Sequence, residues 1–109
     1  MSAVGMERIR GMLGLAMRAG KLVIGTDMIC RAMPRGGISL VVLSGSVSAA
    51  TRKKLTTKCE FYGIRLVEID IETEELGRLL GKTYTPAAAA VTDGGIAEQI
   101  IKAYDALTQ

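Results

Sequence analysis

The segment LVIGTDMICRAMPRGG, residues 22–37, combines a glycine turn with regularly spaced charges. Gly25 ends a short apolar run, and Asp27, Arg31 and Arg35 then recur every four residues. A helix that begins after the glycine would carry these three side chains on one face. Unpaired backbone N–H groups at a helix start, bordered by guanidinium groups, suit phosphate. The chemistry that we predict here is binding of a phosphate chain, such as that of a bent RNA strand.

The same residues have an interpretation that needs no ligand. Most junctions of strand, glycine and helix are tight turns without a bound group. On this interpretation Asp27 pairs with Arg31 on a solvent-facing row, a contact worth roughly 0.3–0.5 kcal/mol. The pattern alone leaves both interpretations open.

The charges of the chain are distributed unevenly, although the net charge is only +3. Residues 1–58 hold ten Lys or Arg and two acidic residues, a net charge of +8, whereas the remainder holds four and nine, a net charge of −5. A positive side of this kind is typical of proteins with a nucleic-acid partner. The alternative is a solvated asymmetry without a partner. A second basic cluster is either a solvated helix face or a peripheral phosphate contact: Arg52, Lys53, Lys54 and Lys58.

Enzymatic chemistry has little support in the sequence. The chain contains no histidine, and its acidic residues are scattered, so no general base, nucleophile pair or metal-binding set is visible. Cys30 and Cys59 are too few for a disulfide framework or a zinc site, and we predict that both are buried thiols. The sequence Asp93-Gly94-Gly95 lacks the lysine of a phosphate loop and is better suited to capping a helix. We therefore predict no enzyme, no cofactor and no metal.

The N-terminal apolar run, residues 11–17, is too short for a membrane span and is interrupted by Arg18. No small-residue cleavage site of a signal peptide follows it. We therefore expect a cytoplasmic protein with reduced thiols and no membrane partner.

Alternating apolar periodicities predict the elements that must position these residues. Helices are predicted over residues 6–18, from Thr26 to a kink or stop near residues 33–36, from about Ser48 to Gly63, from Thr73 to Gly81, and over 96–107. The second of these helices is limited by Pro34, which lacks the N–H of a helical hydrogen bond. Strands are predicted over residues 22–24, 38–44, 64–70 and 87–92. Thr26 and Thr73 are predicted as N-caps. The alternation predicts an α/β fold, a three-layer α/β/α sandwich with a central four-stranded mixed sheet, in one domain over residues 1–109.

Five motifs in order resemble the bacterial branch of the ribosomal protein L7Ae/L30e family. They are MLGLAMRAGKLVIG (12–25), LVVL (40–43), KCEFYGI (58–64), EELGRLLGK (74–82) and AAAAVTDGG (87–95). The resemblance covers nearly the whole chain. It implies a small α/β/α sandwich that binds RNA, typically a kink-turn, which is a sharply bent internal loop with tandem G·A pairs.

The resemblance also implies which residues contact RNA. The family pattern at the glycine turn reads Gly-x-Asn-Glu-x-x-Lys, and this chain has Gly25 and Arg31 at its ends but Asp27 and Met28 in place of Asn and Glu. A carboxylate can only accept hydrogen bonds, so backbone and electrostatic contacts are favoured over base reading here. The segment from Lys82 to Ala88 resembles the part of the family that lies beside this turn. The predicted RNA-binding residues are Lys21, Gly25, Thr26, Asp27, Met28, Arg31, Arg35, Thr85, Pro86, Ala87 and Ala88.

Together these observations predict a ribosome-associated protein that binds and stabilises a bent, structured RNA without catalysis. A second hypothesis is a protein-interaction or scaffolding module of the same fold that has lost RNA recognition, motivated by Asp27 and Met28. A small-ligand or nucleotide-binding enzyme is the third.

Overall fold

Four apolar segments form the central sheet of the computed structural model, which describes residues 3–108. Positions 1, 2 and 109 of the predicted domain lie outside the described residues. The strands are β1 (Leu22–Ile24), β2 (Leu40–Ser44), β3 (Leu66–Ile69) and β4 (Ala88–Val91), in the order β1-β4-β2-β3. Strand β4 is antiparallel to both of its neighbours, and β2 pairs with β3 in parallel. The central strands β2 and β4 are buried throughout, as their unbroken apolar sequences predict.

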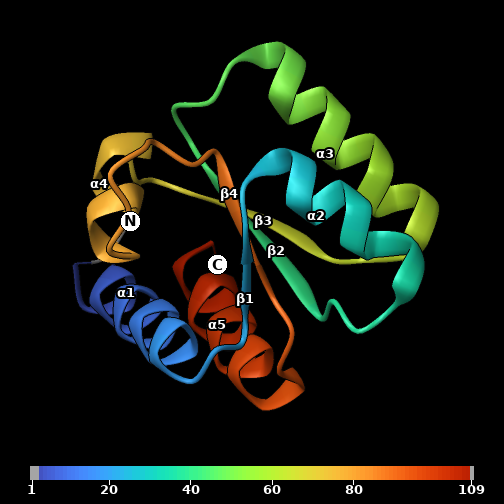
Figure 1. Ribbon diagram of the computed structural model, residues 1–109. Helices are drawn as coiled ribbons and strands as arrows, with labels where there is room; N and C mark the ends of the chain where they lie inside the picture. The colour runs from blue at the N-terminus through green and yellow to red at the C-terminus, as the bar shows by residue number, and fades with distance from the viewer. Residues whose placement is uncertain (1–2, 109) are drawn as a thin grey trace.

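Helices cover both faces of this sheet (Figure 1). On one face lie α1 (Ala3–Arg18), α4 (Thr73–Leu79) and α5 (Gly94–Leu107). On the other lie α2 (Thr26–Ala32), the 3-10 turn η1 (Met33–Arg35) and α3 (Ala49–Tyr62). The predicted three-layer α/β/α sandwich with a four-stranded mixed sheet is confirmed.

The sheet divides the apolar interior into two cores because successive strand side chains point to opposite faces. In β2, Leu40 and Val42 pack with α1, α4 and α5, whereas Val41 and Leu43 pack with α2 and α3. Within the described part of the chain, no helix is both long and apolar enough to cross a membrane.

Three predicted helix ends are confirmed by their hydrogen bonds. The Ser48 hydroxyl accepts a hydrogen bond from the Thr51 backbone N–H at 3.2 Å and caps α3. Gly63 ends the same helix in the left-handed conformation, at φ +67°. The Asp93 carboxylate accepts a hydrogen bond from the backbone N–H of Ile96 at 2.9 Å and caps α5.

Two predicted N-caps are wrong. Thr26 is already the first helical residue of α2, because Gly25 occupies the capping position and offers no side chain. Thr73 is likewise the first residue of α4 and follows Glu72 at the cap. The Thr73 backbone N–H donates instead to the hydroxyl of Ser46, at 3.0 Å, in the loop after β2. One backbone N–H at the start of α4 is therefore satisfied by a residue that is distant in sequence.

Other boundaries also differ from the prediction. Helix α1 begins three residues earlier than expected, and the ends of β2, β3 and β4 are shorter by one or two residues. Helix α2 ends at Ala32, as the predicted stop near Pro34 requires, because proline has no N–H for the helical ladder. Arg35 therefore lies in η1, so the predicted row of Asp27, Arg31 and Arg35 does not follow one helix.

Candidate nucleic-acid interface

The predicted binding turn and the segment 82–88 meet at one edge of the sheet. The carboxyl ends of β1, β2 and β3 lie at this edge together with the amino end of β4. The Gly25 N–H donates to the Ala88 carbonyl at 3.1 Å, and the Ser44 N–H donates to the Ala87 carbonyl at 2.9 Å. In α/β sheets, ligands bind outside such carboxyl ends. Two segments that are sixty residues apart in sequence are thus held side by side.

No side chain caps the start of α2, where Gly25 and Thr26 are half-buried and Asp27 and Met28 are exposed. Gly25 has φ +96°, which favours glycine, and a Cβ built at this position would meet nothing within 4 Å. The first backbone hydrogen bond of the helix runs from the Ile29 N–H to the Gly25 carbonyl at 3.0 Å. The N–H groups of Thr26, Asp27 and Met28 therefore have no intrahelical acceptor. Because α2 is a single short helix of seven residues, these donors matter more than its dipole.

The start of α2 and the segment 82–88 together form what we call the corner. A lysine from the neighbouring helix lies beside it. The Lys54 ammonium of α3 is 3.9 Å from the Asp27 carboxylate, whose side chain is 81% exposed. The predicted pair of Asp27 with Arg31 is wrong, because α2 packs against α3 and brings Lys54 to this carboxylate. Such an exposed pair contributes little to stability, and the Lys54 ammonium, whose side chain is 51% exposed, stays accessible to an anion.

Arg31 itself is exposed, and no carboxylate within residues 3–108 forms an ion pair with it. Arg52 differs, because its guanidinium donates to Glu68 at 2.7 Å and to the Gly45 carbonyl at 3.2 Å. The hydrogen bond and the charge of Glu68 raise the pKa of Arg52. Within the second basic cluster, Arg52 is therefore engaged by the protein, whereas Lys53 and Lys58 lack such a partner in the described chain.

The two helical layers differ in charge. In the layer of α2, η1 and α3 there are six Lys or Arg and two acidic residues, a net charge of +4. In the layer of α1, α4 and α5 there are five of each kind, a net charge of zero. The basic excess that the sequence shows in its first half therefore becomes one positive face of the molecule.

Two predicted site residues lie away from the corner. Lys21 precedes β1 at the opposite end of the strand, roughly 13 Å from Gly25 along an extended chain. Arg35 is exposed at the far end of η1, within the basic layer but not beside the open amides. The structure therefore brings together Gly25, Thr26, Asp27, Met28 and, one turn further on, Arg31.

In the segment 82–88, the residues differ in what they offer to a ligand. The side chains of Pro86 and Ala88 are buried, Ala87 is half-buried, and Thr85 is exposed. Ala88 contributes to the corner through its carbonyl, which holds Gly25.

Three residues near the corner were missed by the sequence analysis as parts of one site. Lys54 was assigned only to a separate basic cluster, and Tyr84, 52% exposed, was not considered. Gly77 of α4 allows the segment 82–88 to pack closely, because a Cβ there would lie 2.6 Å from the Tyr84 carbonyl oxygen. An aromatic residue within a segment already predicted to touch RNA was the signal that could have identified Tyr84.

Within residues 3–108, no three His, Cys, Asp or Glu side chains are placed so that they could hold a metal ion. Burial, with a smaller contribution from nearby Cys30, raises the pKa of the Cys59 thiol to about 11, so this thiol stays protonated at neutral pH. Cys59 is buried as predicted, but Cys30 is only half-buried, contrary to the prediction.

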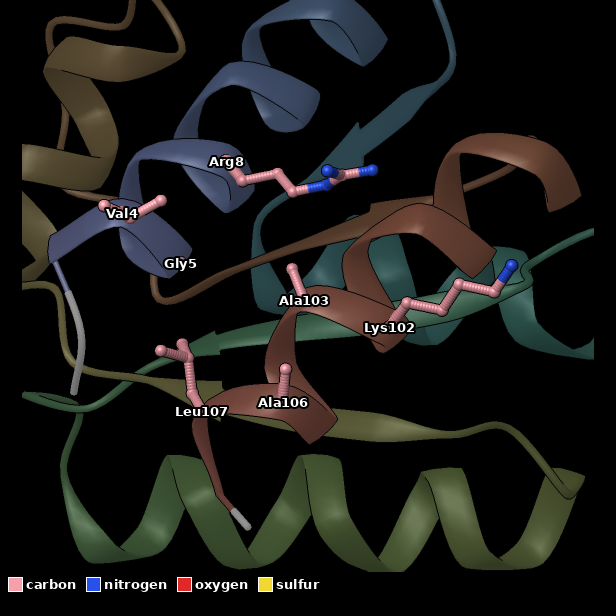
Figure 2. Close-up of a pocket in the computed structure, with 7 residues that line it drawn as sticks. All are labelled: Val4, Gly5, Arg8, Lys102, Ala103, Ala106 and Leu107. Carbon is pink, nitrogen blue, oxygen red and sulfur yellow. The ribbon is translucent and has the colours of Figure 1, made fainter.

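A cavity of about 450 Å³ lies on the other face of the sheet, between α1 and α5. Figure 2 shows the side chains of Arg8 and Lys102 extending from these two helices beside it. The remaining lining residues are Val4, Gly5, Ala103, Ala106 and Leu107. Arg8 and Lys102 supply the ionisable groups of this lining, which contains no carboxylate, thiol or hydroxyl.

Comparisons with known proteins find relatives that match most of this chain. A relative named RNA-binding protein YlxQ from Bacillus subtilis is 36% identical over 94 residues, which cover 86% of this chain and 92% of the relative. The large ribosomal subunit protein eL30 of Methanosarcina mazei is 31% identical over 80 residues, covering 73% and 74%. Neither name denotes an enzyme.

A solved structure shares the fold at low sequence identity. The Giardia lamblia 15.5 kD RNA binding protein superposes with a TM-score of 0.78 at 17% identity, covering 98% of this chain and 92% of that one. The model of the ribosomal protein L7Ae/L30e/S12e/Gadd45 family matches residues 7–101. The chain therefore belongs to this family.

Proposed function

We propose that this chain binds structured RNA through the basic layer, at the corner formed by the start of α2 and the segment 82–88. The observation that carries the proposal is the open set of backbone N–H groups at Thr26, Asp27 and Met28, bordered by Arg31 and accessible to a ribose-phosphate chain. Membership of a family with RNA-binding and ribosomal relatives supports it.

The corner favours a bent RNA over a straight duplex. Gly25 leaves open space at the turn, and the exposed helix start faces outward at the sheet edge. Amide donors and cations that converge from two segments fit phosphates that a bend brings together. The protein would then act by selecting the bent conformer of its RNA, with no catalysis. A kink-turn is the bent RNA that we propose.

The proposal also includes the class of RNA that the chain binds and the compartment in which it acts. We place the chain on ribosomal or other structured RNA in the cytoplasm, acting as one RNA-binding domain over residues 1–109. The eL30 relative supports the ribosomal setting.

A charge reversal at the corner tests the site. In Arg31→Glu, loss of one phosphate contact and repulsion by the new carboxylate should weaken binding of a kink-turn RNA about 10-fold at 0.15 M salt. The slope of log K against log salt should become less steep by about one. Fluorescence anisotropy across a salt series measures both quantities.

Arg18→Glu is the matched control, because it makes the same charge change at an exposed position of α1 in the neutral layer. It should leave affinity within about twofold, since screening is strong beyond about 8–10 Å. Equal effects of the two variants would refute the proposed site. If the parent protein binds neither kink-turn, duplex nor single-stranded RNA, the function itself is wrong, and the scaffolding hypothesis based on Asp27 and Met28 takes its place.

A further inference from the structure

The last turn of α3 presents an aromatic pair on the surface of the basic layer. Phe61, the only phenylalanine of the chain, is 79% exposed, and Tyr62 beside it is 36% exposed. Their ring centroids are 4.9 Å apart and their planes meet at 84°, an edge-to-face contact that orients the two rings. The largest apolar ring of the molecule thus contributes little to its core.

These rings continue a row of cations that begins at the open corner. Lys54, Lys58 and Phe61 are spaced i, i+4 and i+7 along α3, so they share one side of the helix. That side of α3 faces the start of α2, because Lys54 lies beside Asp27. Leu55 and Cys59 of the same helix turn inward to the sheet. The row runs about 10 Å from Lys54 to Phe61, at the helical rise per residue.

A cavity of about 410 Å³ opens at the end of this row. It is lined by Thr57, Lys58, Phe61 and Tyr62. An aromatic face, a hydroxyl and an ammonium group are therefore available to the same bound group.

We infer that this end of α3 is a second RNA contact, at which an unpaired nucleobase beside the bent RNA stacks on Phe61 while Lys58 holds its phosphate. Aromatic side chains next to cations are the usual platform for unpaired bases. The carboxyl end of a helix repels phosphate, so a neutral base fits the last turn better and its phosphate fits the lysine one turn earlier. Continuity with the positive corner favours RNA over a protein partner. This inference rests on the proposed function.

The test compares two kink-turn RNAs, one blunt and one carrying a short unpaired extension. For the extended RNA, Phe61→Ala should weaken binding about 5- to 100-fold, the usual contribution of one stacked base. For the blunt RNA, the same variant should bind as the parent does. Because Phe61 is so exposed, the substitution should leave folding nearly unchanged. Phe61→Leu separates stacking from general apolar contact and should lose most of the same affinity.

The chain has no tryptophan, which gives a direct spectroscopic readout. In Phe61→Trp the single indole should be quenched when the extended RNA binds and stay unquenched with the blunt RNA. Leu15→Ala, at an apolar position 43% exposed on α1, is the control and should bind both RNAs as the parent does.

The outcomes separate this inference from the proposed function. If the parent binds the blunt RNA but Phe61→Ala and the parent bind the extended RNA equally, the second contact is wrong and the aromatic pair belongs to a protein partner. If the parent binds neither RNA, the proposed function fails first.

Discussion

The two helical layers bury the sheet equally well but differ in what they present to solvent. Leu13 of α1 and Leu55 of α3 are both completely buried, one in each core. On the outside, the layer of α1, α4 and α5 has a net charge of zero, and two of its five cations form ion pairs, Arg10 with Glu75 at 2.7 Å and Lys102 with Glu98 at 3.3 Å. The layer of α2, η1 and α3 has a net charge of +4, and Arg31 stands without a carboxylate partner within residues 3–108.

This difference shows that one fold meets two separate requirements, burial of the sheet and binding of a polyanion. Covering the sheet needs an apolar stripe on each helix, and both layers supply it. Binding a polyanion needs cations that the protein does not neutralise, and only the layer of α2 and α3 supplies a net excess. The outer surface of that layer is therefore set by recognition, while its inner surface is set by packing.

The largest predicted effect is a loss of stability when a buried side chain in either core is shortened. Leu13→Ala and Leu55→Ala should each lower the free energy of unfolding by about 2–5 kcal/mol, because each leaves a cavity beside the sheet. Both losses should fall within this range, since both side chains are fully buried. Urea denaturation followed by circular dichroism measures them.

Leu15→Ala is the control for these variants, because its side chain is partly exposed on α1 and should change stability by about 0.5 kcal/mol at most. A loss below about 1 kcal/mol for Leu55→Ala would show that the basic layer packs loosely. The statement that the two layers bury the sheet equally well would then be wrong.

Local sequence was sufficient for the layers of the fold. The unbroken apolar run at residues 40–43 predicts a buried central strand, and Gly63 predicts the end of α3. These features depend on hydrophobic periodicity and on backbone conformations that glycine favours, and both are properties of neighbouring residues.

The candidate site could be predicted only in part, because its assembly depends on contacts between distant segments. A glycine turn at Gly25 was predicted from the local pattern, and its positive φ agrees with that turn, whereas its contact with RNA stays a prediction. The contact of Lys54 with Asp27 depends on how α3 packs on α2, and the hydrogen bond from Thr73 to Ser46 depends on the adjacency of two loops. No periodicity in one segment carries that information.

A smaller effect is predicted at two helix starts that have a side-chain cap, α3 in one layer and α5 in the other. Ser48→Ala in α3 and Asp93→Ala in α5 should each lower stability by about 1 kcal/mol, because each leaves a backbone N–H without its acceptor. Thr26→Ala is the matched control at an uncapped start and should cost less than about 0.5 kcal/mol. Thermal unfolding gives all three values. A cost for Thr26→Ala equal to that of Ser48→Ala would mean that the α2 corner is capped after all, and so closed to a ligand.

The smallest effect is predicted for the one carboxylate at the corner. Asp27→Asn removes a negative charge beside the open amides, frees Lys54, and adds an amide donor that can reach a guanine O6. Binding of kink-turn RNA should strengthen about threefold, with a slightly steeper dependence on salt, because one repulsive charge is lost. Glu60→Gln makes the same charge change at an exposed position of α3, on a different side of the helix from Lys54 and Lys58, and should leave affinity unchanged. Fluorescence anisotropy titrations of both variants with kink-turn RNA measure these affinities. A gain of the same size in both would mean that only the total charge of the basic layer matters, whereas weaker binding by Asp27→Asn would mean that the Asp27 carboxylate itself accepts a hydrogen bond from the RNA.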